Sequence, residues 1–134
     1  MSPADTALGV ALFRRLLALI GGFRFDELPE ILHEEFLFES PYRTDHAVCV
    51  GAAPFAARLK SGLERALTEM TFFIDAEYAS TELDAVIMEY HSEGTRHDGR
   101  AYANAYVGFV WVKEGRIVRF REYTNPIPLL DWPR

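Results

Sequence analysis

Glu122 is the residue best placed to do chemistry, because it interrupts an apolar row. Alternating residues of the predicted strand 116–125 share one face, which should pack against helices. On that face, Glu122 stands among Val118, Phe120 and Thr124. Burial without a charged partner raises the pKa of a carboxyl group toward neutrality, which prepares it for general acid or base catalysis. In the alternative interpretation, Glu122 pairs with a helix residue or a loop N–H group and only organises the fold.

Two hairpin turns decide which residues surround this carboxylate. Asp98-Gly99 and Glu114-Gly115 each suit a two-residue turn, in which both central residues adopt positive φ. Counting outward from these turns places Tyr90 opposite Val107 and Val107 opposite Glu122. Tyr90 is therefore predicted to support Glu122 by a hydrogen bond across Val107. A slip of one residue in the last strand would instead put Glu122 on the surface.

His46 is the second candidate for catalysis. It lies in the loop 42–46, beside the strand end that should border a cavity, and loops on a rigid scaffold often carry reactive groups. The alternative is an ordinary solvated loop histidine. The other histidines are weaker candidates. His91 falls on an outer sheet face, His97 in a hairpin turn and His33 at a helix end.

Neither a metal nor a cofactor is expected. The chain has no HExxH motif, no paired cysteines and no two histidines at the helical spacing of metal ligands. Gly21-Gly22 follows a predicted helix instead of opening one, so it does not form the phosphate loop of a nucleotide site. The candidate chemistry is therefore proton transfer by side chains alone.

Three helices followed by a sheet are expected to position these residues. Apolar residues at helical spacing predict helices that span about 8–21, 26–33 and 51–67. Asp5 or Thr6 can cap the first of them. A short strand is predicted at 35–39, followed by a loop to residue 50. Strand-like alternation then predicts four antiparallel strands joined as hairpins, at 71–80, 85–95, 100–113 and 116–125.

The inner face of this sheet and the helices are expected to enclose a cavity for a small apolar or aromatic molecule. The predicted register puts Val107, Phe109 and Trp111 inside and Asn104 and Tyr106 outside. The residues expected to line the cavity are Phe13, Phe38, Tyr42, Phe55, Leu59, Ser92, Phe109, Trp111, Phe120 and Thr124. Ser92 or Thr124 is also a second possible partner for Glu122. As an alternative, the aromatic residues are plain core.

The composition indicates one soluble globular domain, 1–134, with 49% hydrophobic and 25% charged residues. A net charge of −6 without a long basic stripe argues against a nucleic-acid partner. The apolar stretch 16–20 is preceded by Arg14 and Arg15 and lacks a cleavage site, so neither a signal peptide nor a membrane span is expected. A lone cysteine, Cys49, excludes an internal disulfide and favours a cytoplasmic location.

The order of elements and the segment EGTRHDGRAYANAYVGFVWVKEGRIVRFREYTNP, residues 93–126, resemble the SnoaL-like and ketosteroid isomerase-like families of the nuclear transport factor two-like superfamily. The resemblance implies a cone-shaped, cystatin-like α+β barrel with a curved antiparallel sheet around the N-terminal helices, and a homodimer through the outer sheet face. The REYTNP ending is also similar to that of phenazine biosynthesis A/B proteins, which implies an acid/base role for Glu122.

The chain also departs from the best-known members of that superfamily. Ser40 stands where ketosteroid isomerases have their catalytic aspartate, and Phe13 and Leu16 occupy the stretch of their oxyanion tyrosine. Steroid isomerisation by that mechanism is therefore not expected. The leading hypothesis is a cofactor-independent isomerase, cyclase or condensation catalyst acting on an apolar ring-containing metabolite. The alternative hypothesis is a non-catalytic ligand-binding or dimerisation module of the same fold.

Overall fold

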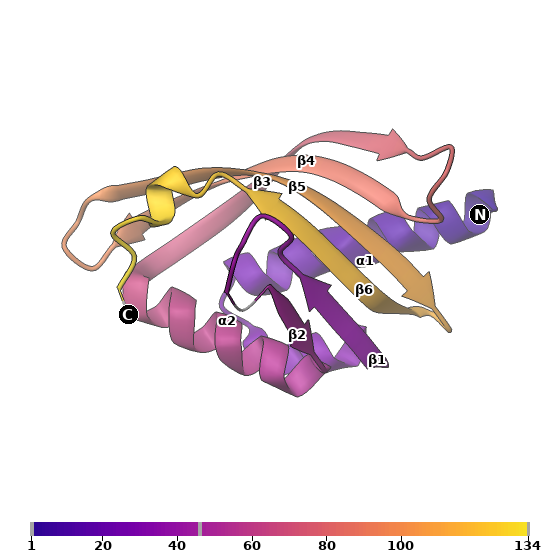
Figure 1. Cartoon of the computed structure of the whole chain (residues 1–134), viewed down its shortest axis with the longest axis horizontal. Helices are drawn as coiled ribbons and strands as arrows, with labels where there is room; N and C mark the ends of the chain where they lie inside the picture. Colours follow the sequence, from indigo (N-terminus) through magenta and orange to yellow (C-terminus); the bar gives the residue numbers. More distant parts are fainter. Residues whose placement is uncertain (1, 46, 134) are drawn as a thin grey trace.

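The computed structural model describes residues 2–45 and 47–133, which form a curved sheet with helices packed against its concave side (Figure 1). The strands lie in the order β2-β1-β6-β5-β4-β3, and the sheet stays open instead of closing into a barrel. The predicted α+β class and the curved sheet are thus confirmed. Within the described ranges, no helix has the length and apolarity that a membrane crossing requires.

Two α-helices supply the layer beneath the sheet. α1 (Pro3–Gly21) buries Phe13 against the sheet, and α2 (Ala52–Ala66) buries Phe55. α2 begins directly after Gly51, whose φ of 99° is accessible at little cost only to glycine. The end of α1 and the start of α2 therefore lie close to their predicted positions, and both helices present apolar faces to the core.

The start of α1 differs from the prediction because Ser2 is its N-cap. The Ser2 hydroxyl accepts the Asp5 N–H group at 3.1 Å, and the Asp5 carboxylate accepts the Ser2 N–H group at 3.2 Å. These reciprocal bonds form a capping box, in which Asp5 occupies the third helical position. The expectation that Asp5 or Thr6 caps the helix was therefore wrong.

The segment between the helices contains more extended structure than expected. The predicted second helix is a 3-10 helix, η1 (Phe25–Glu30), and β1 (Leu32–Glu39) begins immediately after it. β2 (Val48–Val50) lies within the predicted loop and pairs antiparallel with β1. β1 also runs parallel to β6 (Arg116–Thr124), which joins the start of the chain to its last hairpin.

The last four strands pair antiparallel in sequence order, as predicted. They are β3 (Leu67–Ala79), β4 (Val86–Arg96), β5 (Ala101–Lys113) and β6. A short 3-10 helix, η2 (Ile127–Leu129), follows β6.

The predicted register between β4 and β5 was wrong by one residue. The loop is the three-residue segment 97–99, because the Arg96 N–H group donates to the Arg100 carbonyl at 2.8 Å. Gly99 takes the positive φ, 88°, that such a loop requires at its last position. As a result, Tyr90 pairs with Tyr106 instead of Val107.

The predicted register between β5 and β6 was also wrong by one residue, for a different reason. The Glu114-Gly115 turn is a two-residue turn with positive φ at both positions, as predicted. Val112 still pairs with Ile117, but Trp111 pairs with Arg119, so Val118 is an extra residue that forms a β-bulge. Beyond the bulge, Glu122 lies opposite Gly108.

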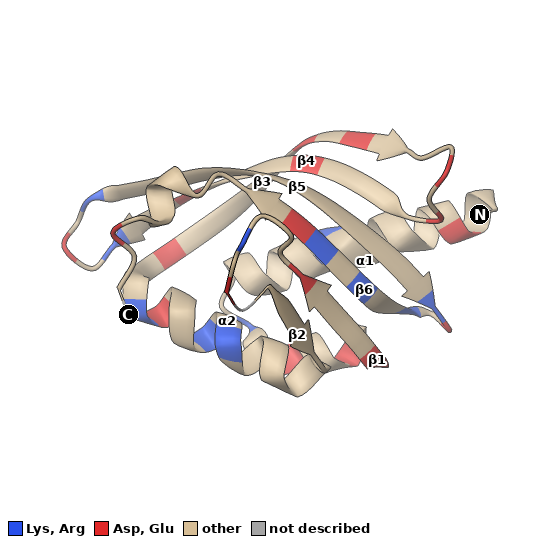
Figure 2. Ribbon diagram, viewed as in Figure 1, with Lys and Arg blue, Asp and Glu red and all other residues tan. Residues whose placement is uncertain are grey.

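Because of these two register errors, the side chains of β5 that were predicted to point inward point outward, and the reverse. The predicted faces of β4, and of β6 beyond the bulge, are correct. Tyr102, Asn104 and Tyr106 therefore point to the concave side. Phe109 and Trp111, which were expected to line the cavity, lie on the outer face instead. There they pack against the arginines of β6, whose basic stripe is visible in Figure 2.

Candidate functional site

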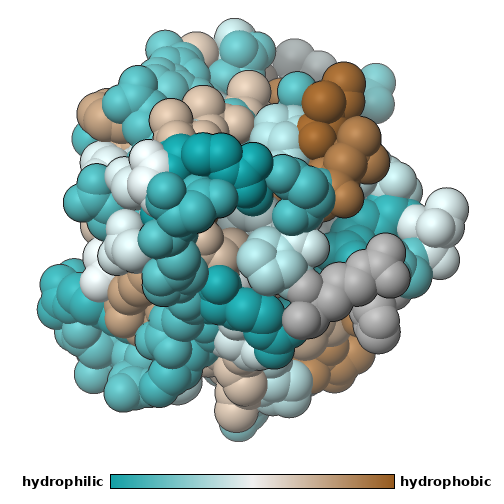
Figure 3. All heavy atoms as spheres, turned by 90° about the vertical axis from the view of Figure 1, so that its left-hand side faces the viewer, coloured by the Kyte–Doolittle hydropathy of each residue, from teal (hydrophilic) through white to brown (hydrophobic). Residues whose placement is uncertain are grey.

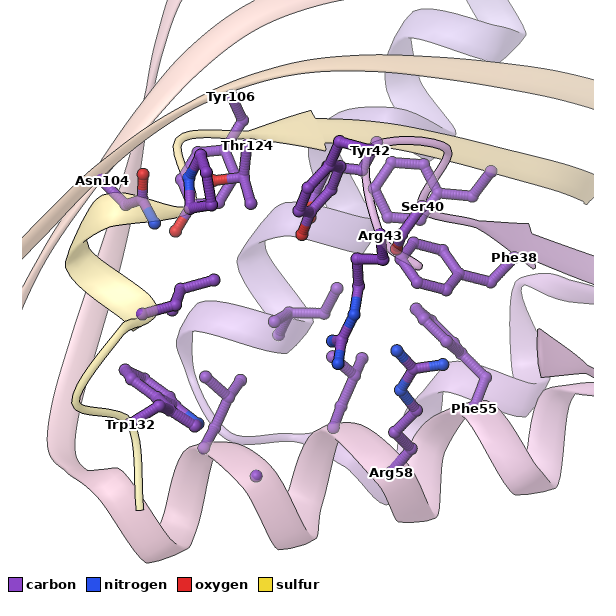
Figure 4. Close-up of a pocket in the computed structure, with 18 of the residues that line it drawn as sticks. Phe38, Ser40, Tyr42, Arg43, Phe55, Arg58, Asn104, Tyr106, Thr124 and Trp132 are labelled. Atoms are coloured by element: carbon purple, nitrogen blue, oxygen red, sulfur yellow. The ribbon is translucent and has the colours of Figure 1, made fainter. Parts of the chain in front are cut away.

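A cavity of about 670 Å³ lies between the concave sheet face, α2 and the segment that follows β6. Such a volume is typical of sites for small organic molecules. Figure 4 shows aromatic and polar side chains directed into it from opposite sides. The lining includes six of the predicted residues, namely Phe38, Tyr42, Phe55, Leu59, Phe120 and Thr124.

Glu122 lines this cavity and has an unusually high pKa for a carboxyl group. The protein around the carboxyl group raises the pKa of Glu122 to about 7, because burial penalises the charged form. The Tyr90 hydroxyl donates to Oε2 at 2.5 Å, which favours the charged form and partly opposes burial. Oε1 has no hydrogen-bond partner among the described residues. A carboxyl group that exchanges its proton near neutral pH therefore has one oxygen free to meet a ligand.

Tyr90 supports Glu122 from behind, outside the lining of the cavity. Its side chain is fully buried, stacked on Tyr106 with ring centroids 5.0 Å apart and in edge contact with Phe13. Gly108 leaves room for it, since a Cβ atom at that position would lie 2.7 Å from the Tyr90 hydroxyl oxygen. Tyr90 is therefore a positioning residue, in keeping with the supporting hydrogen bond to Glu122 that the sequence predicted.

Three polar side chains of β5 extend the site beyond the sequence prediction. Asn104 donates from Nδ2 to the Tyr102 hydroxyl at 3.0 Å, and the hydroxyl groups of Tyr106 and Ser92 lie 2.7 Å apart. Burial raises the pKa of both Tyr102 and Tyr106, so these phenols stay protonated near neutral pH. They were missed because the predicted register placed these side chains of β5 on the outer face of the sheet. The signal available in the sequence was the tripeptide His-Asp-Gly, which also suits a three-residue loop.

The remaining predicted site residues lie elsewhere. Phe13 is fully buried in the core behind Tyr90, and Ser92 is buried beside Tyr106. Neither residue lines the cavity. His46 falls outside the described residues, so its role in catalysis stays a prediction. Within the described ranges, no group of three or more His, Cys, Asp or Glu side chains is arranged to hold a metal ion.

The segment after β6 forms the far wall of the cavity, through residues that include Leu129 and Trp132. Arg96 holds it in place by donating to the Pro128 carbonyl at 3.1 Å and to Asp131 at 3.0 Å. The same guanidinium lies over the rings of Tyr102 and Trp132. Figure 3 faces this end of the molecule and shows a mainly hydrophilic surface with a few hydrophobic groups.

The Tyr90→Phe substitution is expected to raise the pKa of Glu122 above 7 by on the order of one unit, because it removes the only hydrogen bond that stabilises the carboxylate among the described residues. The measurement is an NMR titration of the carbon-13-labelled glutamate carboxyl groups. Tyr78→Phe is the matched control, since Tyr78 donates to Glu89 on the surface at 2.9 Å. An unchanged or lowered Glu122 pKa in Tyr90→Phe would contradict this account.

Comparison with known proteins identifies relatives of this architecture. The family described as SnoaL-like domain matches residues 13–120. The uncharacterised protein YesE of Bacillus subtilis (strain 168) is 28% identical over 101 residues, which cover 73% of this chain and 68% of YesE. An isomerase candidate from Bacillus subtilis has a TM-score of 0.82 at 24% identity, covering 98% of this chain and 95% of that one. An NTF2-like protein from Anabaena variabilis has a TM-score of 0.77 at 20% identity, with 93% of each chain covered.

Proposed function

The chain belongs to the SnoaL-like domain family, and on that premise we propose that it is an acid/base catalyst acting on a small ring-containing metabolite. Glu122 is the proton acceptor and donor. The observation that carries the proposal is a carboxyl group with a pKa of about 7 on the wall of an open cavity. A base of this pKa combines a substantial ionised fraction at neutral pH with a real affinity for the proton.

The surrounding groups suit proton abstraction next to a carbonyl. Glu122 would remove a proton from the carbon, and the electrons would move onto the carbonyl oxygen. The Tyr42 hydroxyl lines the same cavity and has no hydrogen-bond partner among the described residues, so it is available to donate to that oxygen. Returning the proton to a different carbon gives isomerisation, and attack of the enolate on a second carbonyl gives ring closure.

Two features argue against a purely structural role for Glu122. The cavity is not filled by the side chains that line it. No cation pairs with Glu122 within the described ranges, and its hydrogen-bond partner there is Tyr90. A buried carboxylate with a purely structural role is normally paired with a cation. A purely structural role for Glu122 therefore has less support than a catalytic one.

The assignment of Glu122 rests on geometry more than on kinship. The family match ends at residue 120, just before the carboxylate. The isomerase candidate from Bacillus subtilis shares the fold at 24% identity and supports a reaction of that class without specifying one. The similarity of the REYTNP ending to phenazine biosynthesis A/B proteins supports the same residue.

The proposal can be tested without the natural substrate by using 5-nitrobenzisoxazole, a flat aromatic probe of general bases. The base takes the proton from the ring carbon next to nitrogen, the electrons of that C–H bond form a nitrile, and the N–O bond breaks, so that the ring opens to a coloured cyanophenolate. The rate above the buffer reaction should rise with pH and level off around an apparent pKa of about 7, because only ionised Glu122 can accept the proton. No acceleration, or an inflection near the ordinary glutamate pKa, would overturn the proposal.

A further inference from the structure

Arg58 brings a positive charge from α2 into the wall of the cavity. Its guanidinium carbon lies 5.7 Å from the ring centroid of Phe38, so it packs against an aromatic wall residue. Within the described ranges, no carboxylate lies at ion-pair distance from this guanidinium. A cation that faces a cavity without an acidic partner has N–H groups available for a ligand.

Arg43 supplies a second guanidinium from the connection between β1 and β2. Its Nε and Nη2 atoms donate to Asp45 Oδ1 at 3.3 and 3.2 Å, which holds the side chain in place and leaves Nη1 unused within this pair. Figure 4 shows Arg43 and Arg58 directed toward the same part of the cavity. Asp45 offsets the charge of Arg43, so these three side chains together leave one net positive charge on this part of the wall, which favours the entry of an anion.

Tyr42 is close enough to these cations and to Glu122 to interact electrostatically with all of them. Burial and the Glu122 carboxylate raise the pKa of Tyr42, whereas Arg43 and Arg58 lower it. The phenol is therefore within electrostatic reach of both ends of the cavity. The pKa of Glu122 itself follows from burial and from its hydrogen bond to Tyr90. The two arginines therefore form a separate end of the site, and they do not lower the pKa of Glu122.

Apolar side chains fill the wall between the two ends. They come from β1, α2 and β6, and they include Phe38, Phe55, Leu59 and Phe120. The cavity therefore has a proton-transfer end, an apolar middle and a cationic end. We propose that its ligand is a small ring-containing carboxylate, with the ring against the aromatic wall and the carboxylate between Arg43 and Arg58. This inference rests on the proposed function, since it names the class of molecule on which Glu122 acts.

The charge distribution gives the two arginines a role in attracting an anion. The protein carries a net charge of −6, so an anion approaches against the overall field. Figure 2 shows that basic residues occur both in the loop after β1 and along α2, where they oppose that field locally. Guanidinium groups also match the planar, two-oxygen geometry of a carboxylate. Binding the anion at this end keeps it away from ionised Glu122, which limits repulsion between the two carboxylates.

The test is calorimetric binding of 2-naphthoate and 2-naphthamide, which have the same ring and nearly the same shape but differ in charge. The naphthoate is expected to bind at least about tenfold more tightly than the amide to the unmodified chain. The double variant Arg43→Gln and Arg58→Gln should bring the two affinities to within about threefold, while the amide keeps its affinity. Arg65→Gln is the matched control, because Arg65 is exposed on α2 and contacts Ser61.

Three results would each overturn the inference: no detectable naphthoate binding, equal binding of both probes, or a preference that survives in the double variant. Glu122→Gln separates this inference from the proposed function. It should retain the preference for naphthoate, because anion binding does not need the acid. A preserved preference without any proton transfer to Glu122 would remove only the proposed function. Proton transfer without the preference would remove only the carboxylate ligand.

Discussion

Replacing Glu122 by glutamine is expected to lower the rate of proton abstraction from 5-nitrobenzisoxazole at pH 8 by at least about 100-fold. Because the amide has nearly the shape of the carboxyl group, the hydrogen bond from Tyr90 and the cavity wall stay in place. The amide cannot accept the proton from the probe, however, so the base is lost. The measurement is the release of the cyanophenolate under identical conditions. Glu93→Gln is the matched control, because Glu93 is an exposed carboxylate of β4. A Glu122→Gln variant that keeps its rate would exclude Glu122 as the base.

The same substitution should stabilise the folded protein at pH 8. The folded carboxyl group holds its proton more tightly than the unfolded one, so the unmodified chain loses stability as the pH rises from about 4.5 to about 7. Above that range, ionised Glu122 costs up to roughly 3 kcal/mol, which glutamine avoids. Urea unfolding at pH 5 and pH 8 measures the difference. A variant that is both more stable and inactive cannot have lost its activity by unfolding.

Gly108→Ala is expected to destabilise the fold by about 1–3 kcal/mol and to detach Tyr90 from Glu122. The new Cβ atom would lie 2.7 Å from both the Tyr90 hydroxyl oxygen and the Phe13 ring, and these buried side chains have little room to move. Loss of the hydrogen bond should also raise the pKa of Glu122 further. Urea unfolding measures the first effect, and the carboxyl titration measures the second.

Gly62→Ala is the matched control for this prediction. Gly62 lies in α2, and no atom comes within 4 Å of a Cβ atom at that position. An alanine there should gain up to about 1 kcal/mol from its better helix propensity. Equal effects of the two substitutions on stability would show that the close approach at Gly108 has no energetic role.

The sequence predicted the environment of Glu122 correctly on β4 and β6 and incorrectly on β5. Alternation along a strand is a local property, so the inward direction of Tyr90 and of Glu122 follows from residue order alone. The pairing of strands depends on one extra residue in a loop and one in a bulge, at His97 and Val118. The two errors fell on the same strand, and the Tyr90–Glu122 hydrogen bond was therefore found across Gly108 instead of Val107.

Other parts of the site could not be predicted because they depend on long-range contacts. The parallel pairing of β1 with β6 brings the loop with Arg43 to the cavity, and the packing of α2 brings Arg58. Nothing in the local pattern distinguishes these arginines from ordinary surface residues. Position on the surface of a helix says which residues share a face, but only the folded chain says which faces meet.

The way Arg96 fastens the last segment makes one end of the cavity replaceable. The Arg96 side chain donates to the Pro128 carbonyl and to Asp131, Arg100 donates to Asp131 as well, and the Trp132 ring lies under the Arg96 guanidinium. The sheet contributes the acid and its tyrosine, so residues 126–132 can change in bulk without disturbing either of them. Substitutions in this segment could therefore change the length of ligand that the cavity accepts. The proton-transfer pair of Glu122 and Tyr90 would stay the same in every variant.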